Sequence, residues 1–242
     1  MRFFFRNFSG VLLLYLFTTQ AHPQLPAAEK PMYGLAGKQK KLTERDMAFI
    51  ASIEKAGKTR QAVAKEVIVQ AWEAYGKTDY KTAIRKFNQA WLLDAENGDA
   101  FHGFALISTV RDKSADEAEK YFKMALGKPG VNVNAYVDYG RFLWIVDRFD
   151  EALTHLHKAL SLAPTARNAR SNIAMIHYKK SEWSKACEWA RGAKANQDDL
   201  QPDFLEEMCK KGGLASGPEP ANLAKARPVT AAIRSSRKKT RA

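Results

Sequence analysis

Small and apolar residues recur along the chain with the period of an α-helix. In four segments an alanine is followed four positions later by a bulkier or apolar residue and seven positions later by another alanine: Ala83/Phe87/Ala90, Ala118/Phe122/Ala125, Ala152/Leu156/Ala159 and Ala186/Ala190/Ala193. The first alanines are 35, 34 and 34 residues apart. A stripe of small residues lets a neighbouring helix approach closely, so the pattern predicts a repeated unit of packed helices.

A second amphipathic helix is predicted before each of these segments. Its small residue lies twelve or thirteen positions upstream, at Ala71, Ala105, Gly140 and Ala174. The second repeat has the longer separation, which predicts one inserted residue in the turn Arg111–Ser114. Each unit is therefore expected to contain two helices and a short turn, in repeats of about 64–97, 98–132, 133–166 and 167–200.

The third repeat resembles the tetratricopeptide (TPR) signature, with a small residue at position 8, alanines at 20 and 27, an apolar residue at 24 and proline at 32: Gly140, Ala152, Ala159, Leu156 and Pro164. Position 32 is Ala95, Gly130 and Asp198 in the other repeats, so this proline is kept only once. The first repeat and the start of the second are similar to secreted or periplasmic bacterial TPR proteins. The resemblance implies an all-α, right-handed superhelix of about four repeats, with the first helix of each pair lining the concave side.

Both ends of such a stack need a capping helix, because its terminal faces are apolar. At the N-terminal end, Thr43-x-x-Asp46 resembles a helix start, and Met47, Ile50 and Ile53 form an apolar row before Gly57. At the C-terminal end we expect a helix over 202–210, with Pro202 in its first turn and an apolar stripe of Phe204, Leu205 and Met208. The solenoid is predicted to span 43–211.

The remaining segments differ in composition from this domain. Residues 1–21 have two early arginines, an apolar run Val11–Phe17 and small residues before a cleavage site after Ala21, which predicts a secretory signal peptide and an exported, periplasmic or secreted protein. Residues 22–42 are expected to form an irregular leader, and 212–242 a disordered basic tail. Of the net charge of +13, +6 falls on that tail and only +2 on 43–211.

Catalytic and metal-binding patterns are weak in this sequence. His155 and His157 are two positions apart on a predicted helix, so they point to different faces and do not form a metal-binding pair. No Gly-rich phosphate loop or local nucleophile motif is present, so we expect neither an enzyme nor a bound cofactor. Cys187 and Cys209 either form a disulfide or remain as two buried thiols.

The TPR resemblance places the binding surface on the first helix of each pair. The concave positions so implied, with His102 as the best match in the second repeat, are Trp72, Tyr75, His102, Asn134, Arg141, Trp144, Asn168, Met175, Tyr178 and Lys179. Aromatic rings interleaved with amides and cations suit an extended peptide. The carboxylate clamp of cytosolic relatives needs Lys at position 5 and Asn at position 9, and is missing: those positions are Ile68 and Trp72 in the first repeat and Val137 and Arg141 in the third.

These observations predict a non-catalytic scaffold or adaptor that binds a protein or peptide and helps to assemble a complex at the cell envelope. One alternative is an assembly factor resembling the type IV pilus pilotin, suggested by the run DYGRFLWIVDRFDEA, although a lipid-attachment cysteine is missing from the N-terminal segment. Another alternative is a nucleic-acid or membrane-surface binder acting through the basic tail. A nucleic-acid partner is not expected, because no aromatic residue is interleaved with the tail charges. Membrane association would need that tail or an uncleaved signal, and the oligomeric state stays open.

Overall fold

The computed structural model describes residues 25–35 and 41–214. Over these ranges it contains no strand, two short 3-10 helices and the ten helices α1 (Glu44–Lys55), α2 (Arg60–Gly76), α3 (Tyr80–Leu93), α4 (Gly98–Val110), α5 (Ala115–Leu126), α6 (Val133–Ile145), α7 (Phe149–Leu162), α8 (Ala169–Lys179), α9 (Trp183–Ala195) and α10 (Pro202–Lys211). None of these helices is long and apolar enough to cross a membrane. The predicted signal peptide and almost all of the predicted tail lie outside the described residues.

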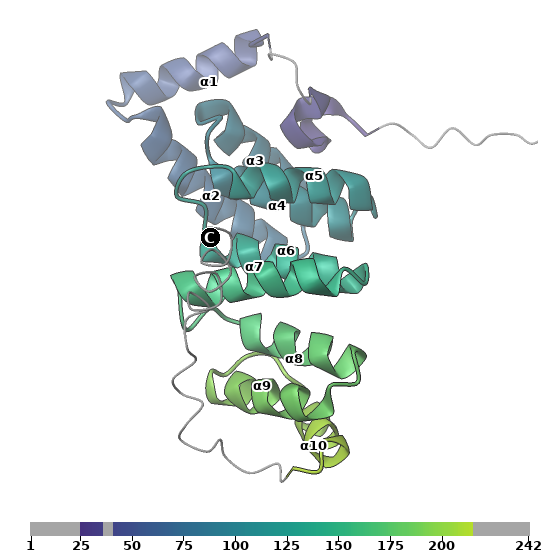
Figure 1. Ribbon diagram of the computed structural model, residues 1–242. Coiled ribbons are helices and arrows are strands. Elements are labelled where there is room, and N and C mark those ends of the chain that lie inside the picture. The colour runs from purple at the N-terminus through teal and green to yellow at the C-terminus, as the bar shows by residue number, and fades with distance from the viewer. Residues whose placement is uncertain (1–24, 36–40, 215–242) are drawn as a thin grey trace, which may run out of the picture.

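The helices form four antiparallel pairs, α2 with α3, α4 with α5, α6 with α7 and α8 with α9. The second helix of each pair packs on the first helix of the next, and α2 also contacts α4 as α6 contacts α8. Figure 1 shows the pairs stacked in series between α1 at one end and α10 at the other. The predicted all-α solenoid is confirmed.

The repeated alanines are the points of closest helix approach. Ala83, Ala118, Ala152 and Ala186 are all completely buried, as are the alanines seven residues after each of them. Gly140 shows how little room is left, because a Cβ there would lie 2.6 Å from Cγ of Leu156 on the paired helix. A larger side chain would push the helices apart, so the spacing of small residues fixes the stack.

The turns inside the pairs repeat as strictly as the helices. Each contains one non-glycine residue with a left-handed backbone, at Thr78, Lys113, Asp147 and Ser181, so that these residues are 35, 34 and 34 positions apart. Three residues separate the paired helices in the first, third and fourth repeats, and four residues separate α4 from α5. The insertion predicted in the turn Arg111–Ser114 is therefore present.

The N-terminal cap α1 begins where the sequence predicts, but one residue of its apolar row is exposed. The Thr43 hydroxyl accepts a hydrogen bond from the backbone N–H of Asp46 at 3.2 Å, and the Asp46 carboxylate accepts one from the backbone N–H of Thr43 at 2.9 Å, so aspartate completes the capping box. Ile50 and Ile53 are buried, whereas Met47 is 51% exposed. The expectation for Met47 was wrong, because residues at a strict three-residue spacing drift around a helix of 3.6 residues per turn.

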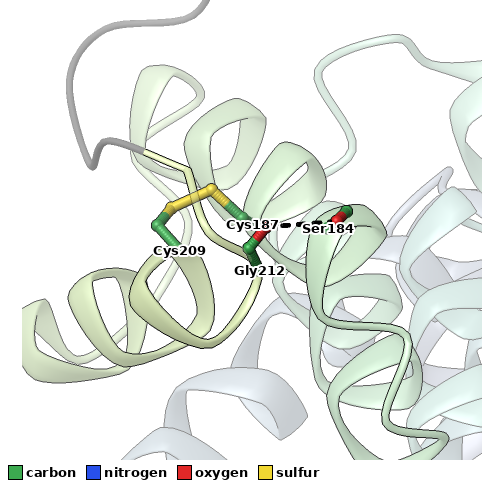
Figure 2. The surroundings of a disulfide bond; sticks show 4 residues. All are labelled: Ser184, Cys187, Cys209 and Gly212. Atoms are coloured by element: carbon green, nitrogen blue, oxygen red, sulfur yellow. Dashed lines mark hydrogen bonds between the residues drawn. A yellow bond between two sulfur atoms is a disulfide. The ribbon is translucent and has the colours of Figure 1, made fainter.

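The C-terminal cap is joined covalently to the last helix pair. Leu205 and Met208 of α10 are buried against α9 and α8. A disulfide links Cys187 in α9 to Cys209 in α10, with a Cα–Cα distance of 4.6 Å. Figure 2 shows this bond beside a second link, in which the Ser184 hydroxyl donates to the carbonyl oxygen of Gly212 at 3.4 Å.

Residues 25–35 contain regular structure, although an irregular leader was predicted for 22–42. They form the 3-10 helices η1 (Ala27–Glu29) and η2 (Pro31–Gly34), which pack on α3 (Figure 1). The side-chain amide of the buried Asn88 donates to the carbonyl oxygens of Ala28 and Lys30 at 3.0 and 2.9 Å. The polar backbone of this segment is thus satisfied by a side chain more than fifty residues away, which local sequence patterns do not reveal.

Candidate functional site

A cavity of about 530 Å³ lies against the first helices of three successive pairs. Most of its lining comes from α2, α4 and α6, with one ring from α5 and one residue from the loop before α6. The lining residues are Trp72, Tyr75, His102, Leu106, Thr109, Val110, Phe122, Asn132, Asn134, Asp138, Arg141, Phe142 and Ile145. We call this space the inner cavity.

Helix periodicity explains why these side chains face one space. The α6 residues Asn134, Asp138, Arg141 and Ile145 follow each other at intervals of four, three and four, which places them on one helical face. His102, Leu106 and Thr109 repeat the pattern on α4. The inner cavity is therefore lined by one row of side chains from α4 and one from α6, together with the Trp72 and Tyr75 rings of α2.

Aromatic rings form the apolar wall of the inner cavity. The Trp72 ring lies 4.9 Å from the Phe87 ring, 4.9 Å from the His102 ring and 5.8 Å from the Tyr75 ring, measured between centroids. Phe87 is completely buried, whereas Trp72 and Tyr75 are half-buried. Such rings can bury an apolar side chain of a ligand at little cost in conformational entropy.

A histidine–aspartate contact joins the two rows of side chains. His102 Nε2 lies 2.8 Å from Asp138 Oδ2, and the His102 side chain is only 3% exposed. Within the described part of the chain, the buried Nδ1 of His102 has no hydrogen-bond partner. The contact between His102 and Asp138 therefore ties the side-chain row of α4 to the row of α6.

The polar side chains that line the inner cavity differ in burial and in their interactions. Burial, aided by the negative charge of Asp138, raises the pKa of Tyr75 to about 12, so its hydroxyl stays protonated at neutral pH. Asn132, Asn134 and Arg141 are exposed. In the chain as described, Arg141 forms no ion pair, although its charge opposes the rise in the pKa of Tyr75.

The inner cavity brings together five of the ten groove residues expected from the TPR resemblance. Trp72 and Tyr75 come from α2, His102 from α4, and Asn134 and Arg141 from α6. The other five lie outside it.

Two of those five contribute to contacts between the third repeat, the fourth repeat and the loop after α9. The indole N–H of Trp144 donates to Oδ1 of Asn172 in α8 at 3.3 Å. Asn168, immediately before α8, has a left-handed backbone, and its side chain accepts from the backbone N–H of Asp199 at 2.7 Å and donates to the Asp199 carboxylate at 3.0 Å.

The remaining three lie in or near the C-terminal end of the stack. Met175 and Tyr178 pack against the small core that α8, α9 and α10 share. The Tyr178 hydroxyl donates to the Glu207 carboxylate of α10 at 2.6 Å, and Lys179 is exposed. The C-terminal cap therefore engages a tyrosine that the family pattern assigns to the groove.

Asp138 is the main site residue that the sequence analysis did not identify. The concave positions of the TPR pattern in this helix include Asn134, Val137 and Arg141 but not Asp138. Helical spacing from Asn134 was the available signal, because Asp138 lies four residues further along the same face. Its contact with His102 depends on how α4 and α6 stack, so the sequence alone could not show it.

Neither His155 nor His157 lines the inner cavity, and their rings contact different partners. His155 contacts the ring of Tyr139 at 4.5 Å and His157 contacts the ring of Trp189 at 5.5 Å, which agrees with the prediction that they face different ways. Burial lowers the pKa of both imidazoles. Across the described ranges, no three His, Cys, Asp or Glu residues are placed to hold a metal ion.

Comparisons with known proteins give matches at the level of structure. No family model and no curated protein matches the sequence. The solved structure of pilF from Pseudomonas aeruginosa is similar with a TM-score of 0.57 and 18% identity, over 64% of this chain and 71% of that one. PilW, a widely conserved type IV pilus biogenesis factor, gives a TM-score of 0.53 and 17% identity, over 73% of this chain and 89% of that one.

A third similar structure is YrrB, a TPR protein with an unusual peptide-binding site, which gives a TM-score of 0.45 and 20% identity over 68% of this chain and 90% of that one. At these identities the likenesses concern the fold alone. Together with the serial stacking of the helix pairs and the repeated turns, the two higher-scoring matches lead to one conclusion: the chain has the all-helical solenoid fold of TPR proteins.

Proposed function

We propose that this protein is a non-catalytic scaffold that binds an extended segment of a partner protein in the inner cavity, within a complex of the cell envelope. The observation that carries the proposal is the composition of that cavity, in which half-buried rings lie beside exposed amides and a cation. Rings can bury apolar side chains, and the amides of Asn132 and Asn134 can bond the backbone of an extended chain. Because the stack builds this surface before a partner arrives, binding requires little reorganisation.

The experiment for this proposal is capture of binding partners from an envelope extract by the full chain, followed by quantitative mass spectrometry. Ile145 lines the cavity and is 55% exposed, so Ile145→Glu puts a charge into the binding surface without disturbing the core. Leu162 is 52% exposed and is not a lining residue, which makes Leu162→Glu the matched control. We expect Ile145→Glu to lower recovery of the specific partners about tenfold or more and Leu162→Glu to leave it unchanged.

Equal recovery with both variants would contradict the proposal. A third bait lacking residues 213–242 tests the alternative that the basic tail binds nucleic acid or a membrane surface. If the tail carries the function, this deletion abolishes binding while Ile145→Glu has no effect.

A second candidate function is assembly of type IV pili, as a pilotin-like factor. It is favoured by the likeness to pilF and PilW, which shows the fold and leaves the role to be tested. The run DYGRFLWIVDRFDEA that suggested it from sequence spans the second half of α6 and the start of α7, and it carries Asp138 and Arg141 of the cavity. Pilus subunits among the captured proteins would support this role. Their absence from a capture made with the extract of a pilus-bearing host would refute it.

A further inference from the structure

We propose that the inner cavity recognises an acidic residue within a partner chain, next to a bulky apolar residue, and that Arg141 receives the carboxylate. This inference rests on the proposed function and gives the chemistry of the segment that binds.

The guanidinium N–H donors of Arg141 have no partner among the described residues. Several arginines of the solenoid are held by carboxylates: Arg85 by Glu29 at 2.6 Å and Arg148 by Glu119 and Glu151, both at 2.6 Å. Arg141 is exposed at the cavity and, among the described residues, forms neither an ion pair nor a hydrogen bond. A guanidinium carries a planar set of N–H donors that matches a carboxylate through two parallel hydrogen bonds.

Two acids lie near Arg141 without forming an ion pair with it. Hydrogen bonds from Asn168 and Arg167 lower the pKa of Asp199, and the charge of Arg141 adds to this effect, so Asp199 is within its electrostatic reach. The other acid, Asp138, belongs to the same helix as Arg141. Asp138 lies one helical turn before it on the same face, at a spacing at which ion pairs commonly form. The Asp138 carboxylate instead contacts His102 across the gap between α4 and α6, at 2.8 Å. The negative charge of Asp138 is still close enough to Arg141 to lower the affinity for an acidic ligand. Substitution of Asp138 therefore tests the role of charge at this position.

Apolar side chains beside Arg141 provide a place for the bulky residue of the ligand. The rings of Trp72, Phe122 and Phe142 and the side chains of Leu106 and Ile145 line the same space as Arg141. A volume of about 530 Å³ is within the range of roughly 300–1,000 Å³ that is typical of ligand pockets. The inner cavity can therefore hold a bulky side chain together with the chain segment that carries the acid.

The position of Arg141 favours an internal residue over a chain terminus. Asn134 and Asp138 precede it on its helical face and Ile145 follows it, so lining residues lie on both sides of the guanidinium. A segment whose carboxylate meets Arg141 finds contacts in both directions, with the exposed amide of Asn134 available to one flank. A terminal carboxylate would leave one of these flanks empty.

The test is selection of a displayed library of random twelve-residue segments, fused at both ends, on the immobilised full chain. We expect the wild-type chain to enrich Asp or Glu beside Trp, Phe, Tyr or Leu.

Arg141→Glu should lower affinity for the selected segments about tenfold or more, and replacing their acid by lysine should restore binding to this variant. Asp138→Asn should strengthen binding of the acidic segments, because it removes a negative charge beside Arg141. Arg45→Glu, which makes the same charge change at an exposed position on α1 outside the cavity, should leave binding unchanged.

Three outcomes would overturn this inference. The first is enrichment of basic residues, which would indicate that Asp138 binds the ligand. The others are an acid preference that survives Arg141→Glu, and binding only of segments with a free C-terminal carboxylate. Ile145→Glu separates these failures from failure of the proposed function. If Ile145→Glu abolishes recovery while Arg141→Glu changes nothing, the cavity binds peptides of other chemistry. If neither variant affects recovery, both proposals fail.

Discussion

Single residues set the distance between neighbouring helices in this protein. A Cβ added to Gly103 in α4 would lie 2.4 Å from ring atoms of Phe87, a completely buried residue of α3 that also contacts Trp72. Gly103 therefore determines how closely the second helix pair sits on the first. Phe87 packs on Trp72, which in turn packs on His102, and both of these residues line the inner cavity. Gly103 therefore also helps to shape that cavity.

Gly103→Ala is expected to destabilise the protein by about 1–3 kcal/mol, because a packed ring would have to move. Gly76→Ala is the matched control, since a Cβ there meets nothing within 4 Å and alanine is the better helix former. We expect Gly76→Ala to be neutral or to stabilise by up to about 1 kcal/mol. Urea denaturation followed by circular dichroism measures both. Equal effects of the two substitutions would show that close packing at Gly103 is not the cause.

At the scale of elements, charged contacts link one helix pair to the next. Arg148, at the start of α7, pairs with Glu119 of α5 at 2.6 Å and with Glu151 of its own helix at 2.6 Å. The Tyr139 hydroxyl of α6 donates to Glu119 at 3.3 Å. Hydrogen bonds from Arg148 first, and from Lys123 second, lower the pKa of Glu119 from its usual 4.5 to about 2. The second and third repeats therefore share one carboxylate.

Glu119→Gln is expected to lower the free energy of unfolding at pH 7 by about 1 kcal/mol, a modest value because solvent reaches the pair. A lowered pKa in the folded state means that the stabilisation is complete above pH 4.5 and is lost as the pH falls towards 2. The difference between wild type and variant should therefore shrink over that window, as measured by urea denaturation at a series of pH values. Glu66→Gln, which breaks an exposed pair with Lys58, is the control and should have a smaller effect at pH 7. A difference that is independent of pH would contradict this assignment.

At the scale of the whole molecule, stability depends on how the ends of the stack are covered. One large core runs from Met32 in the leader to Ile176 in α8, and a smaller core contains Leu205, Met208 and the two cysteines. The larger core includes residues of every helix from α1 to α8, whereas α10 contributes only to the smaller one. The disulfide attaches α10 to α9 across a sequence separation of 22 residues.

Reduction of this disulfide is expected to destabilise the C-terminal cap by about 3 kcal/mol in a chain-entropy estimate. The chain has two cysteines, so a reductant acts on this bond alone. We expect dithiothreitol to lower the Tm of the wild type, and the double substitution Cys187→Ala and Cys209→Ala to show a lowered Tm that no longer responds to it. Hydrogen exchange should then increase first in α10. A wild-type Tm that is insensitive to reduction would show that packing alone holds the cap.

The sequence by itself determined the repeats, the helix pairs, the inserted residue and both caps. These features follow from local periodicity and capping chemistry, since the phase of an alanine stripe or the start of a helix at Thr43 is encoded within a few turns of the chain. The positions of Trp72, Tyr75, His102, Asn134 and Arg141 on the first helices could be predicted for the same reason, once the TPR resemblance supplied which face is concave.

Only the tertiary structure decided which of those residues share a space. The contact between His102 and Asp138 spans 36 residues, and the docking of residues 25–35 on Asn88 spans more than fifty. Tyr178 fits the same family pattern as Trp72, yet its hydroxyl bonds Glu207 of the C-terminal cap. Such choices depend on the spacing between stacked helices, which side-chain volumes throughout the core set together and which no short stretch of sequence encodes.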